Sequence, residues 1–522
     1  MYHFFFKKFY IFYDLTFLLK FFFFCTILFL FVLLFFLFFY KLQIQSTLYE
    51  ELYLYKFKLI SFFFVSFLSL YFFICTLFLT LFWFHNFYID LNYLNELSFR
   101  IKFKDFNFFL FNWNNDYCSL FLISINKFNI IFFTLFCFLY PIIFALIGND
   151  YTVLHYRFYI YKYLIFILSY YLLATDNIIL FYIIYEFILI LVFAVMYLSS
   201  NARGGVEAAL FFAGWAVLGS ILVGLGVVNL VVLTNQSSFN LITLNKLTHN
   251  ESYYLYLLFF FGFGTKLSTW PFWYWLPRAH VEVSTGMSVF LSCILIKLSY
   301  YGLIKMQFLL SSEISLNICL IVTFLCVIDI VFRLVNLKDL KAVIAYSSVL
   351  HTNLLLALVH LDNFKIMNWT ILYVWGHSLA TTVLFISVNL IEARYGSRNI
   401  IQVAGVWYTI PTVGYLTLWS LISFLDLPIT LFFWGELWLW VVMLNNLPLI
   451  AVQIIFICCV IFVCIFFKIW WGVLFGVPDI YIKKVTSNNY IELIILTLWL
   501  LAFQFLLGAQ PSILTSFVGY IF

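Results

Sequence analysis

The sequence predicts an all-α polytopic membrane protein with about 14 transmembrane helices. Hydrophobic residues make up 66% of its 522 residues, charged residues make up 9%, and the mean hydropathy is +1.08. Soluble domains average about 25% charged residues, so this chain is not a water-soluble globule. Apolar runs of about 20 residues recur along it, as lipid-spanning helices require. The alternating segments of about ten residues that mark a spanning β-barrel are absent.

The predicted spans follow one another with short polar connections. They cover residues 17–40, 59–83, 117–147, 158–175, 177–198, 207–233, 253–276, 281–305, 314–335, 341–361, 367–391, 403–433, 435–467 and 489–508. The polar stretch 84–116 and the segment 234–252, which is rich in Asn, Ser and Thr, are predicted loops. Loops on one side of this layout carry more Lys and Arg, so the positive-inside rule puts both termini on the other side.

Several classes of partner and site are not expected. The net charge of +5 is modest and indicates no nucleic acid. The ten cysteines lie in apolar runs without a metal-ligand spacing, so they are interpreted as small buried hydrophobes. No nucleotide-binding loop, redox-metal site or catalytic nucleophile is visible. The first apolar run is too long for a cleavable signal peptide.

The residue usage itself suggests an origin. The chain has 71 Phe and 36 Tyr but only 20 Gly and 8 Pro. Phe, Tyr, Ile, Leu, Asn and Lys have A/T-rich codons, so the bias indicates an A/T-rich gene such as an organelle genome can have. The alternative is that Phe is simply a good lipid-facing residue.

Prolines interrupt two of the predicted spans beside charged residues. Pro271 lies in the seventh span near Lys266, and Pro428 lies in the twelfth shortly before Glu436. Discontinuous helices at the middle of a membrane free backbone groups that can hold ions or water. A proline alone is more often a simple kink, but a proline beside a buried charge favours an ion site.

Six ionisable side chains fall on six different spans and form the candidate site. They are Glu186, Lys266, Lys297, His351, His377 and Glu436. A charge at the bilayer centre costs about 2.5–3.5 kcal/mol on insertion scales, so it is kept only where it is paired or hydrated. Glu186 and Lys266 form a natural pair. Lys, His and Glu side chains in series can pass protons through intervening waters, which indicates an ion pathway.

Each residue also has a purely structural interpretation. His351 or His377 alone is more often a hydrogen-bonding group between helices. Glu186 and Lys266 can form a static bridge, and Lys297 can snorkel from a shifted span. We favour the pathway because all of these residues would have to be structural at the same time.

A further charged group lies between the seventh and eighth spans. It comprises Arg278, His280 and Glu282, close to Pro277. These residues either stabilise a helix junction, or His280 and Glu282 extend the relay.

Several motifs together resemble a known family. They are WLPRAHVEV (Trp275–Val283), ILIKLSYYG, DLKAVIAYSSVLH (Asp339–His351), WGHSLATTVLF (Trp375–Phe385) and LPITLFFWGEL (Leu427–Leu437), with NDYCSLFLISIN and LFYIIYEFILI upstream. They resemble the antiporter-like membrane subunits of respiratory complex I, in particular NADH:ubiquinone oxidoreductase chain 4. The resemblance covers about residues 112–440, and the two ends match only as hydrophobic spans. AHVE, and Glu436 where chains 2 and 5 carry a Lys, favour chain 4.

The resemblance implies an internal organisation. Residues 158–305 and 314–467 would form two inverted five-helix repeats, with helices 7 and 12 discontinuous. The remaining parts would be two helices and a polar loop (1–116), helix 3 (117–147), and a C-terminal helix and tail (489–522).

The resemblance also implies roles for the site residues. Glu186 and Lys266 would form the inter-helix pair, Lys297 would be the central proton carrier, and His377 a relay. Glu436 would face the exit or the next subunit. Two positions depart from the family pattern. Trp273 stands where the family usually has a His, and Ser268 stands where it usually has a proline.

The implied function is proton translocation, driven by NADH oxidation and quinone reduction in other subunits. FMN, iron-sulfur clusters and ubiquinone would bind to those subunits, and this chain would hold no cofactor or metal. The implied partners are subunits similar to chains 2 and 5, accessory subunits, membrane lipids and a respiratory supercomplex. Together with the codon bias, the resemblance predicts that the protein lies in the mitochondrial inner membrane, with both termini on the intermembrane-space side. Two alternatives stay open: a subunit of a multi-subunit cation/proton antiporter, and a non-pumping scaffold subunit.

Overall fold

The computed structural model describes residues 99–100, 124–125, 127–149, 156–199, 203–242, 247–310, 317–361, 367–477 and 489–509. The chain divides into two compact units, residues 1–64 and 65–522, and every described residue belongs to the second. The predicted spans 17–40 and 59–83 lie outside the described residues. So do most of the predicted loop 84–116 and the tail after residue 509.

Apart from one short antiparallel strand pair, the regular elements of the described residues are helices. Strand β1 (Phe99–Arg100) pairs with β2 (Ser124–Ile125), with Phe99 opposite Ile125. The helices in chain order are α3 (Lys127–Asn149), α4 (Tyr156–Ala174), α5 (Ile178–Ser199), α6 (Arg203–Thr234), α7 (Phe239–Ile242), α8 (His249–Leu267), η3 (Phe272–Tyr274), α9 (Trp275–Glu282), α10 (Thr285–Phe290), η4 (Leu291–Leu295), α11 (Ile296–Leu310), α12 (Asn317–Leu334), α13 (Leu340–Leu361), α14 (Met367–Tyr395), α15 (Val406–Thr409), α16 (Pro411–Phe424), α17 (Leu431–Asn446), α18 (Leu449–Phe475) and α19 (Asn489–Ala509).

Six helical segments of the described part are long and apolar enough to cross a membrane. They are Ile178–Leu198, Arg203–Thr234, Thr285–Leu310, Leu340–Leu361, Thr370–Tyr395 and Leu449–Phe475. The fold class is therefore that of a helical membrane protein. The number of 14 spans and the inverted repeats stay predictions.

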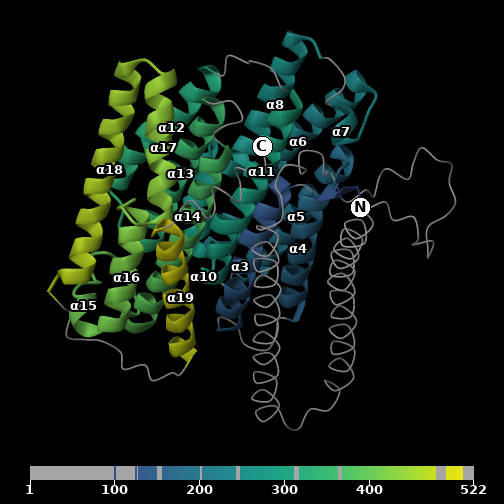
Figure 1. The fold of residues 1–522 in the computed structure, drawn as a ribbon. Helices are drawn as coiled ribbons and strands as arrows, with labels where there is room; N and C mark the ends of the chain where they lie inside the picture. The colour runs from purple at the N-terminus through teal and green to yellow at the C-terminus, as the bar shows by residue number, and fades with distance from the viewer. Residues whose placement is uncertain are drawn as a thin grey trace, which may run out of the picture. The chain divides into compact units, whose positions relative to one another are not determined.

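These six segments fall into inner and outer helices. The spans through α10–α11, α13 and α14 are buried inside the protein almost throughout, whereas α5, α6 and α18 are less than half buried. Large apolar side chains are exposed on the outer helices, as on Ile190 of α5, Val232 of α6 and Ile450 of α18. In Figure 1, α18 lies at one edge of the ribbon and α13 and α14 lie inside it. Outward apolar surface of this kind suits contact with lipid.

Several predicted boundaries are wrong. Helix α3 begins at Lys127 and not near residue 117, because residues 124–125 pair as a strand. The predicted loop 234–252 contains the short helix α7. The predicted span 403–433 holds α15 and α16 and ends its helix at Phe424.

The predicted span 435–467 is also wrong, because two helices meet within it. Helix α17 ends at Asn446, and α18 begins at Leu449. Leu447 between them has an extended backbone, with ψ of 154°. The residue before a proline is disfavoured in the helical region, so Pro448 separates the two helices.

The seventh predicted span is discontinuous in the structure. Helix α8 ends at Leu267, and its C-cap residue Ser268 adopts the left-handed conformation, with φ of 57°. The chain resumes as η3 and α9 beyond Pro271. Helix α8 packs closely on α6, since a Cβ atom at Gly262 would lie 2.6 Å from Val223 Cγ2. Small residues allow such close approach of membrane helices.

A second discontinuity separates α16 from α17. Residues 425–430 are not helical, and Asp426 and Ile429 have φ values of 54° and 82°. Helix α17 then begins with Thr430 as N-cap, whose hydroxyl accepts a hydrogen bond from the Phe433 amide at 3.3 Å.

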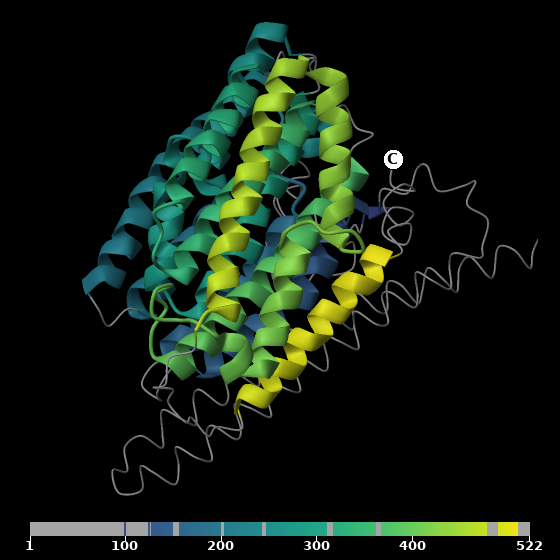
Figure 2. The same ribbon diagram turned by 90° about the vertical axis from the view of Figure 1, so that its left-hand side faces the viewer.

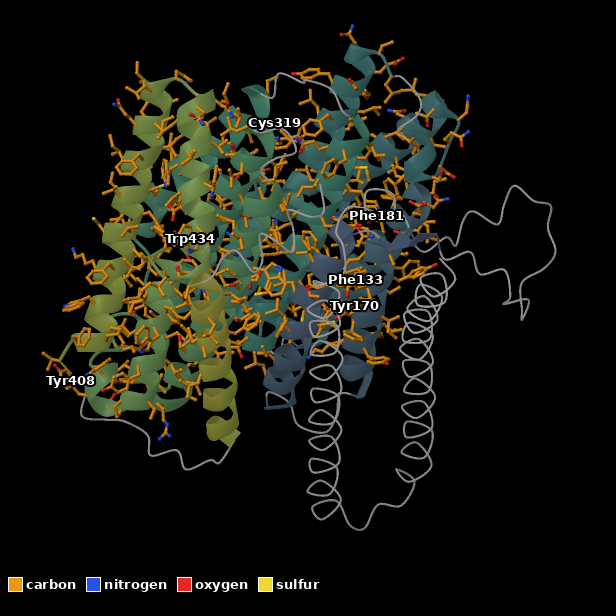
Figure 3. All side chains as sticks on the ribbon, in the orientation of Figure 1. Phe133, Tyr170, Phe181, Cys319, Tyr408 and Trp434 are labelled. Carbon is orange, nitrogen blue, oxygen red and sulfur yellow. The ribbon has the colours of Figure 1, made fainter. Side chains whose placement is uncertain are left out.

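Helix α17 is held between α14 and α19. A Cβ atom at Gly435 would lie 2.8 Å from Tyr373 Cα, so the backbones of α14 and α17 nearly touch. Figure 2 shows α19, in yellow, along the green C-terminal helices. The Trp434 indole, labelled in Figure 3, donates a hydrogen bond of 2.8 Å to the Gly508 carbonyl. These contacts set the position of Glu436 on α17.

Candidate functional site

The first predicted pair joins α5 and α8. Lys266 Nζ lies 3.5 Å from Glu186 Oε1, and the lysine side chain is 1% exposed while the glutamate side chain is 25% exposed. Lys266 is in the last turn of α8, where the carbonyl end of the helix favours a positive charge. The Nζ atom also lies 3.8 Å from the centre of the Tyr185 ring. The ion pair and the cation–π contact together offset the cost of burying the amine.

Tyr185 extends this pair toward the interior. Its hydroxyl and the Ser299 hydroxyl are 2.8 Å apart. Ser299 lies on α11, the helix that also carries Lys297. The Glu186–Lys266 pair is thus connected, through a tyrosine ring and one hydrogen bond, to the helix of the central lysine.

Lys297 is buried, and its amine contacts a backbone carbonyl and an imidazole. Its side chain is 1% exposed, and its Nζ donates to the Ser292 carbonyl at 2.9 Å and meets His377 Nδ1 at 2.8 Å. The π-helical turn η4 lies directly before it, and such turns are frequent at functional sites. Within the described residues no carboxylate forms an ion pair with Lys297. A proton on its amine can therefore pass to a neutral acceptor, the imidazole of His377.

The structure joins His351 to the same series. The rings of His351 and His377 have centroids 5.8 Å apart, and His351 Nδ1 lies 3.1 Å from the Tyr373 hydroxyl. Both histidines are 2% exposed and both contact the rings of Phe424 and Phe432. The series Lys297–His377–His351–Tyr373 therefore runs through an aromatic enclosure formed by the ends of α16 and α17.

Glu436 lies at the far end of this series, half-buried on α17. The Trp440 indole donates to its Oε1 at 3.3 Å. Asp426 lies in the break before α17, and its Oδ1 atom is enclosed without a hydrogen-bond partner among the described residues. Tyr373 lies beside this part of α17, since a Cβ atom at Gly435 would lie 2.8 Å from Tyr373 Cα. The break thus holds a second acid, Asp426, besides the Glu436 that the sequence indicated on α17.

The residues around the α9–α10 junction lie apart from this series. His280 is fully buried and stacks on Phe385 with ring centroids 5.1 Å apart, and neither ring nitrogen has a hydrogen-bond partner within the described residues. Glu282 is exposed. The Arg278 guanidinium lies 4.9 Å from the centre of the Phe211 ring. No direct contact joins His280 or Glu282 to Lys297 in the described part of the chain.

Trp273, one of the two departures from the family pattern, has a structural partner. Its indole donates to Asp329 Oδ2 at 3.1 Å, and the Arg333 guanidinium lies 4.7 Å from its ring centre. The same carboxylate pairs with Arg333 at 2.9 Å. A tryptophan at this position binds an aspartate and an arginine, and offers no imidazole for proton transfer.

Sequence reasoning missed three residues of the site. Tyr185 and Tyr373 carry no signal among the 36 tyrosines of the chain. Asp426 did carry one, since it is an acid in the apolar stretch LISFLDLPIT directly before Leu427-Pro428. The same criterion that selected Glu436 would have selected it.

Comparisons with known proteins agree on the family. The family model described as NADH:quinone oxidoreductase/Mrp antiporter, TM, matches residues 175–462. NADH-ubiquinone oxidoreductase chain 4 of Paramecium tetraurelia is 28% identical over 307 residues, which are 59% of this chain and 65% of that protein. Chain 4 of Arabidopsis thaliana is 28% identical over 263 residues, 50% of this chain and 53% of that protein. The matched regions thus span less than two thirds of these relatives.

Solved structures share the fold. A subunit of an archaeal membrane-bound sulfane sulfur reductase has a TM-score of 0.70 at 17% identity, covering 76% of this chain and 82% of its own. A chain of the Mrp complex from Dietzia sp. has a TM-score of 0.68 at 18% identity, covering 77% and 84%. A chain of respiratory complex I from Thermus thermophilus with bound NADH has a TM-score of 0.67 at 17% identity, covering 77% and 86%.

Proposed function

Because the chain belongs to the NADH:quinone oxidoreductase/Mrp antiporter transmembrane family, we propose that it conducts protons across a membrane as a subunit of a respiratory NADH:ubiquinone oxidoreductase. The relatives named chain 4 support this assignment within the family. The arrangement of its buried ionisable groups supports the conduction of protons.

One observation carries the proposal most directly. The amine of Lys297 is buried, lacks a carboxylate partner in the described structure, and lies 2.8 Å from His377 Nδ1. A charged ammonium there donates its N–H to the imidazole, becomes a neutral amine, and leaves the imidazole protonated. General acid–base transfer needs donor and acceptor within about 2.6–3.2 Å, which this pair meets. A static bridge would instead require a permanent counter-charge.

The Glu186–Lys266 pair would control this transfer. Separating Lys266 from Glu186 places an unpaired positive charge near α11, and this disfavours a second positive charge on Lys297. The pair is suited to such a change because Glu186 is partly exposed and contacts Lys266 at 3.5 Å, at the long end of an ion pair. Proton affinity at Lys297 would thus follow the state of the pair without redox chemistry in this chain.

The proposed redox subunits and neighbours of this chain also follow from its family. NADH oxidation and quinone reduction would take place in partner subunits, which would hold FMN, iron-sulfur clusters and ubiquinone. Subunits similar to chains 2 and 5, accessory subunits and membrane lipids would surround this chain, and the complex would join a respiratory supercomplex. The codon bias supports the mitochondrial inner membrane, with both termini in the intermembrane space.

The proposed architecture keeps about 14 spans and two inverted five-helix repeats, residues 158–305 and 314–467. Each repeat would contain one discontinuous helix, beside Lys266 in the first and beside Glu436 in the second. The remaining parts would be residues 1–116, helix 3 within 117–147, and the C-terminal helix and tail, 489–522. His280 and Glu282 remain candidates for an extension of the relay on the α9 side.

A cation/proton antiporter is the second candidate function. The fold is shared with a chain of the Mrp complex, so the fold does not distinguish the two. A native gel of gently solubilised membranes, stained for NADH dehydrogenase activity and analysed by mass spectrometry, separates them. Co-migration of this chain with NADH-oxidising subunits supports the first candidate. A band of antiporter-like subunits without NADH activity supports the second.

Proton conduction is tested on membrane vesicles that contain the whole complex. Lys297→Met should lower proton uptake coupled to NADH oxidation by about 10²-fold to 10⁴-fold while the complex assembles. Lys468→Met, on an exposed position of α18, is the matched control and should pump normally. Normal pumping by the Lys297 variant would leave this chain as a scaffold.

A further inference from the structure

Two side chains of α13 hold the end of α8, where that helix stops beside Lys266. Asn353 Nδ2 donates to the Ser268 carbonyl at 3.2 Å, and the Thr352 hydroxyl donates to the Leu267 carbonyl at 3.4 Å. The last carbonyls of a helix have no partner within it, and a buried carbonyl needs a donor from elsewhere. Helix α13 therefore supplies hydrogen bonds that α8 loses at its break.

The orientation of the Asn353 amide follows from its surroundings. Its Nδ2 also donates to the Val349 carbonyl at 2.8 Å, so the amide donates to two carbonyl oxygens, one in α13 and one at the end of α8. The amide oxygen Oδ1 is enclosed and has no hydrogen-bond partner among the described residues. An unpaired buried acceptor lowers stability. The amide is thus oriented for its contact with α8, although its own oxygen remains unpaired.

The other donors at this end of α8 do not replace the amide. The Cys326 thiol lies 3.8 Å from the same Ser268 carbonyl, and a thiol is a weak donor. The Trp275 indole donates at 2.7 Å to the Thr265 carbonyl, which lies earlier in the last turn of the helix. Among the described residues, Asn353 is therefore the one strong side-chain donor to the carbonyl of the C-cap residue.

Helix α13 is a firm support for this contact. Its span Leu340–Leu361 is buried inside the protein almost throughout. His351, two positions before Asn353, packs against the rings of Phe424 and Phe432, whose centroids lie 4.9 Å and 5.0 Å from its own. A side chain in a closely packed interior has little freedom to follow a shift of its neighbour. Asn353 therefore anchors the end of α8 to the core, at the turn that carries a histidine of the proposed relay.

We propose that Asn353 is a positioning residue, which holds the end of α8 so that Lys266 reaches Glu186. Without the amide, the Ser268 carbonyl is buried without a strong donor, and the last turn of α8 moves to find one. Lys266 lies in that turn, with its Nζ 3.5 Å from Glu186 Oε1. A displacement of about 1 Å takes the two atoms beyond the distance of about 4 Å that defines an ion pair. This role rests on the proposed proton conduction, in which the Glu186–Lys266 pair controls the central lysine.

Asn353→Ser removes this contact selectively. The shorter hydroxyl still reaches the Val349 carbonyl in its own helix, as the Ser348 hydroxyl reaches the Ile344 carbonyl at 2.9 Å, but it does not reach the Ser268 carbonyl. Ser348→Ala is the matched control, since it removes only such a bond within α13. Coupled proton uptake is measured in vesicles that contain the complete complex. We expect a loss of about 10-fold to 10²-fold in Asn353→Ser, as for a misplacement of about 1 Å, and a normal rate in the control.

Labelling of Glu186 separates positioning from a merely structural role. A glutamate that loses its lysine in an apolar environment takes up a proton, and a hydrophobic carbodiimide reacts with protonated carboxyl groups. Mass spectrometry should therefore find several-fold more adduct on Glu186 in Asn353→Ser, and in the similarly sized Asn353→Leu, than in Ser348→Ala. Equal labelling in the three variants would overturn the placement of Lys266 by Asn353. Added adduct with a normal rate of uptake would overturn the role in transport, and if Lys297→Met also pumps normally, the proposed proton conduction itself is rejected.

Discussion

The two broken helices of this protein stop in the same way, at a residue with positive φ before a proline, but their charged residues differ in their partners. At the end of α8, a residue with positive φ and a following proline stop the helix beside Lys266, which pairs with Glu186. Between α16 and α17, Asp426 itself has positive φ before a proline, and no described lysine or arginine forms an ion pair with Asp426 or with Glu436 on α17. The glutamate at the first break is balanced by a lysine, whereas the two acids near the second break have no basic partner among the described residues.

This difference teaches that a break in a membrane helix does not determine what the site does. The break exposes backbone groups and permits a polar side chain, but the partner on the neighbouring helix decides the chemistry. A lysine facing a glutamate makes a charge pair that can open and close. Two acids without a described basic partner leave their negative charge without such a pair.

The largest expected effect on proton uptake follows from substitution of Lys297, which lies between the two breaks in the chain. Lys297→Met removes the amine that contacts His377 and should lower coupled proton uptake by about 10²-fold to 10⁴-fold, the usual contribution of a proton-transfer group. Uptake per NADH oxidised in membrane vesicles is the measurement. If only the Glu186–Lys266 pair carried protons, the variant would pump normally. Lys297 would then not connect the residues of the two breaks.

A second substitution compares the stability of the two sites. Glu186→Gln leaves Lys266 buried without its counter-charge, which costs about 3–5 kcal/mol for a buried pair. Glu436→Gln removes an acid that has no basic partner among the described residues and keeps an oxygen that accepts from the Trp440 indole, so it should cost much less. Thermal inactivation of the solubilised complex measures both. Equal losses of stability would show that the two sites do not differ in this way.

Tyr373→Phe tests the end of the Lys297–His377–His351–Tyr373 series. The ring that packs on Phe432 stays, while the hydroxyl that contacts His351 is lost. We expect coupled uptake to fall by about 10-fold, below the usual range for a primary proton-transfer group, with little change in thermal stability. An unchanged rate would place Tyr373 outside the path.

Tyr185→Phe is expected to have the smallest effect. The variant keeps an aromatic face over Lys266 and loses the hydrogen bond to Ser299. The loss should be about 0.5–1.5 kcal/mol of stability, as for a single hydrogen bond, with near-normal proton uptake. A large loss of uptake would instead make the Tyr185–Ser299 contact part of the path between Lys266 and Lys297.

Much of the site was accessible to sequence reasoning because its residues are chemically exceptional where they stand. A lysine or glutamate in an apolar span is visible from its immediate neighbours, and that singled out Glu186, Lys266, Lys297 and Glu436. Prolines likewise indicated where helices stop, although Pro448 was overlooked as the boundary of α17 and α18. Tyrosines gave no such contrast, because the chain is rich in them.

The sequence by itself determined the medium, the helical class, the family motifs and the ionisable residues placed in apolar spans. Each of these features depends on the composition or on residues that are close together in the chain. Only the tertiary structure decided which groups meet: Lys297 and His377 are 80 residues apart in the chain, and Tyr185 and Ser299 are 114 apart. The contacts of His351 and His377 with Phe424 and Phe432 also arise from packing between helices. Contacts across such separations depend on how helices pack, and no local pattern of residues records that packing.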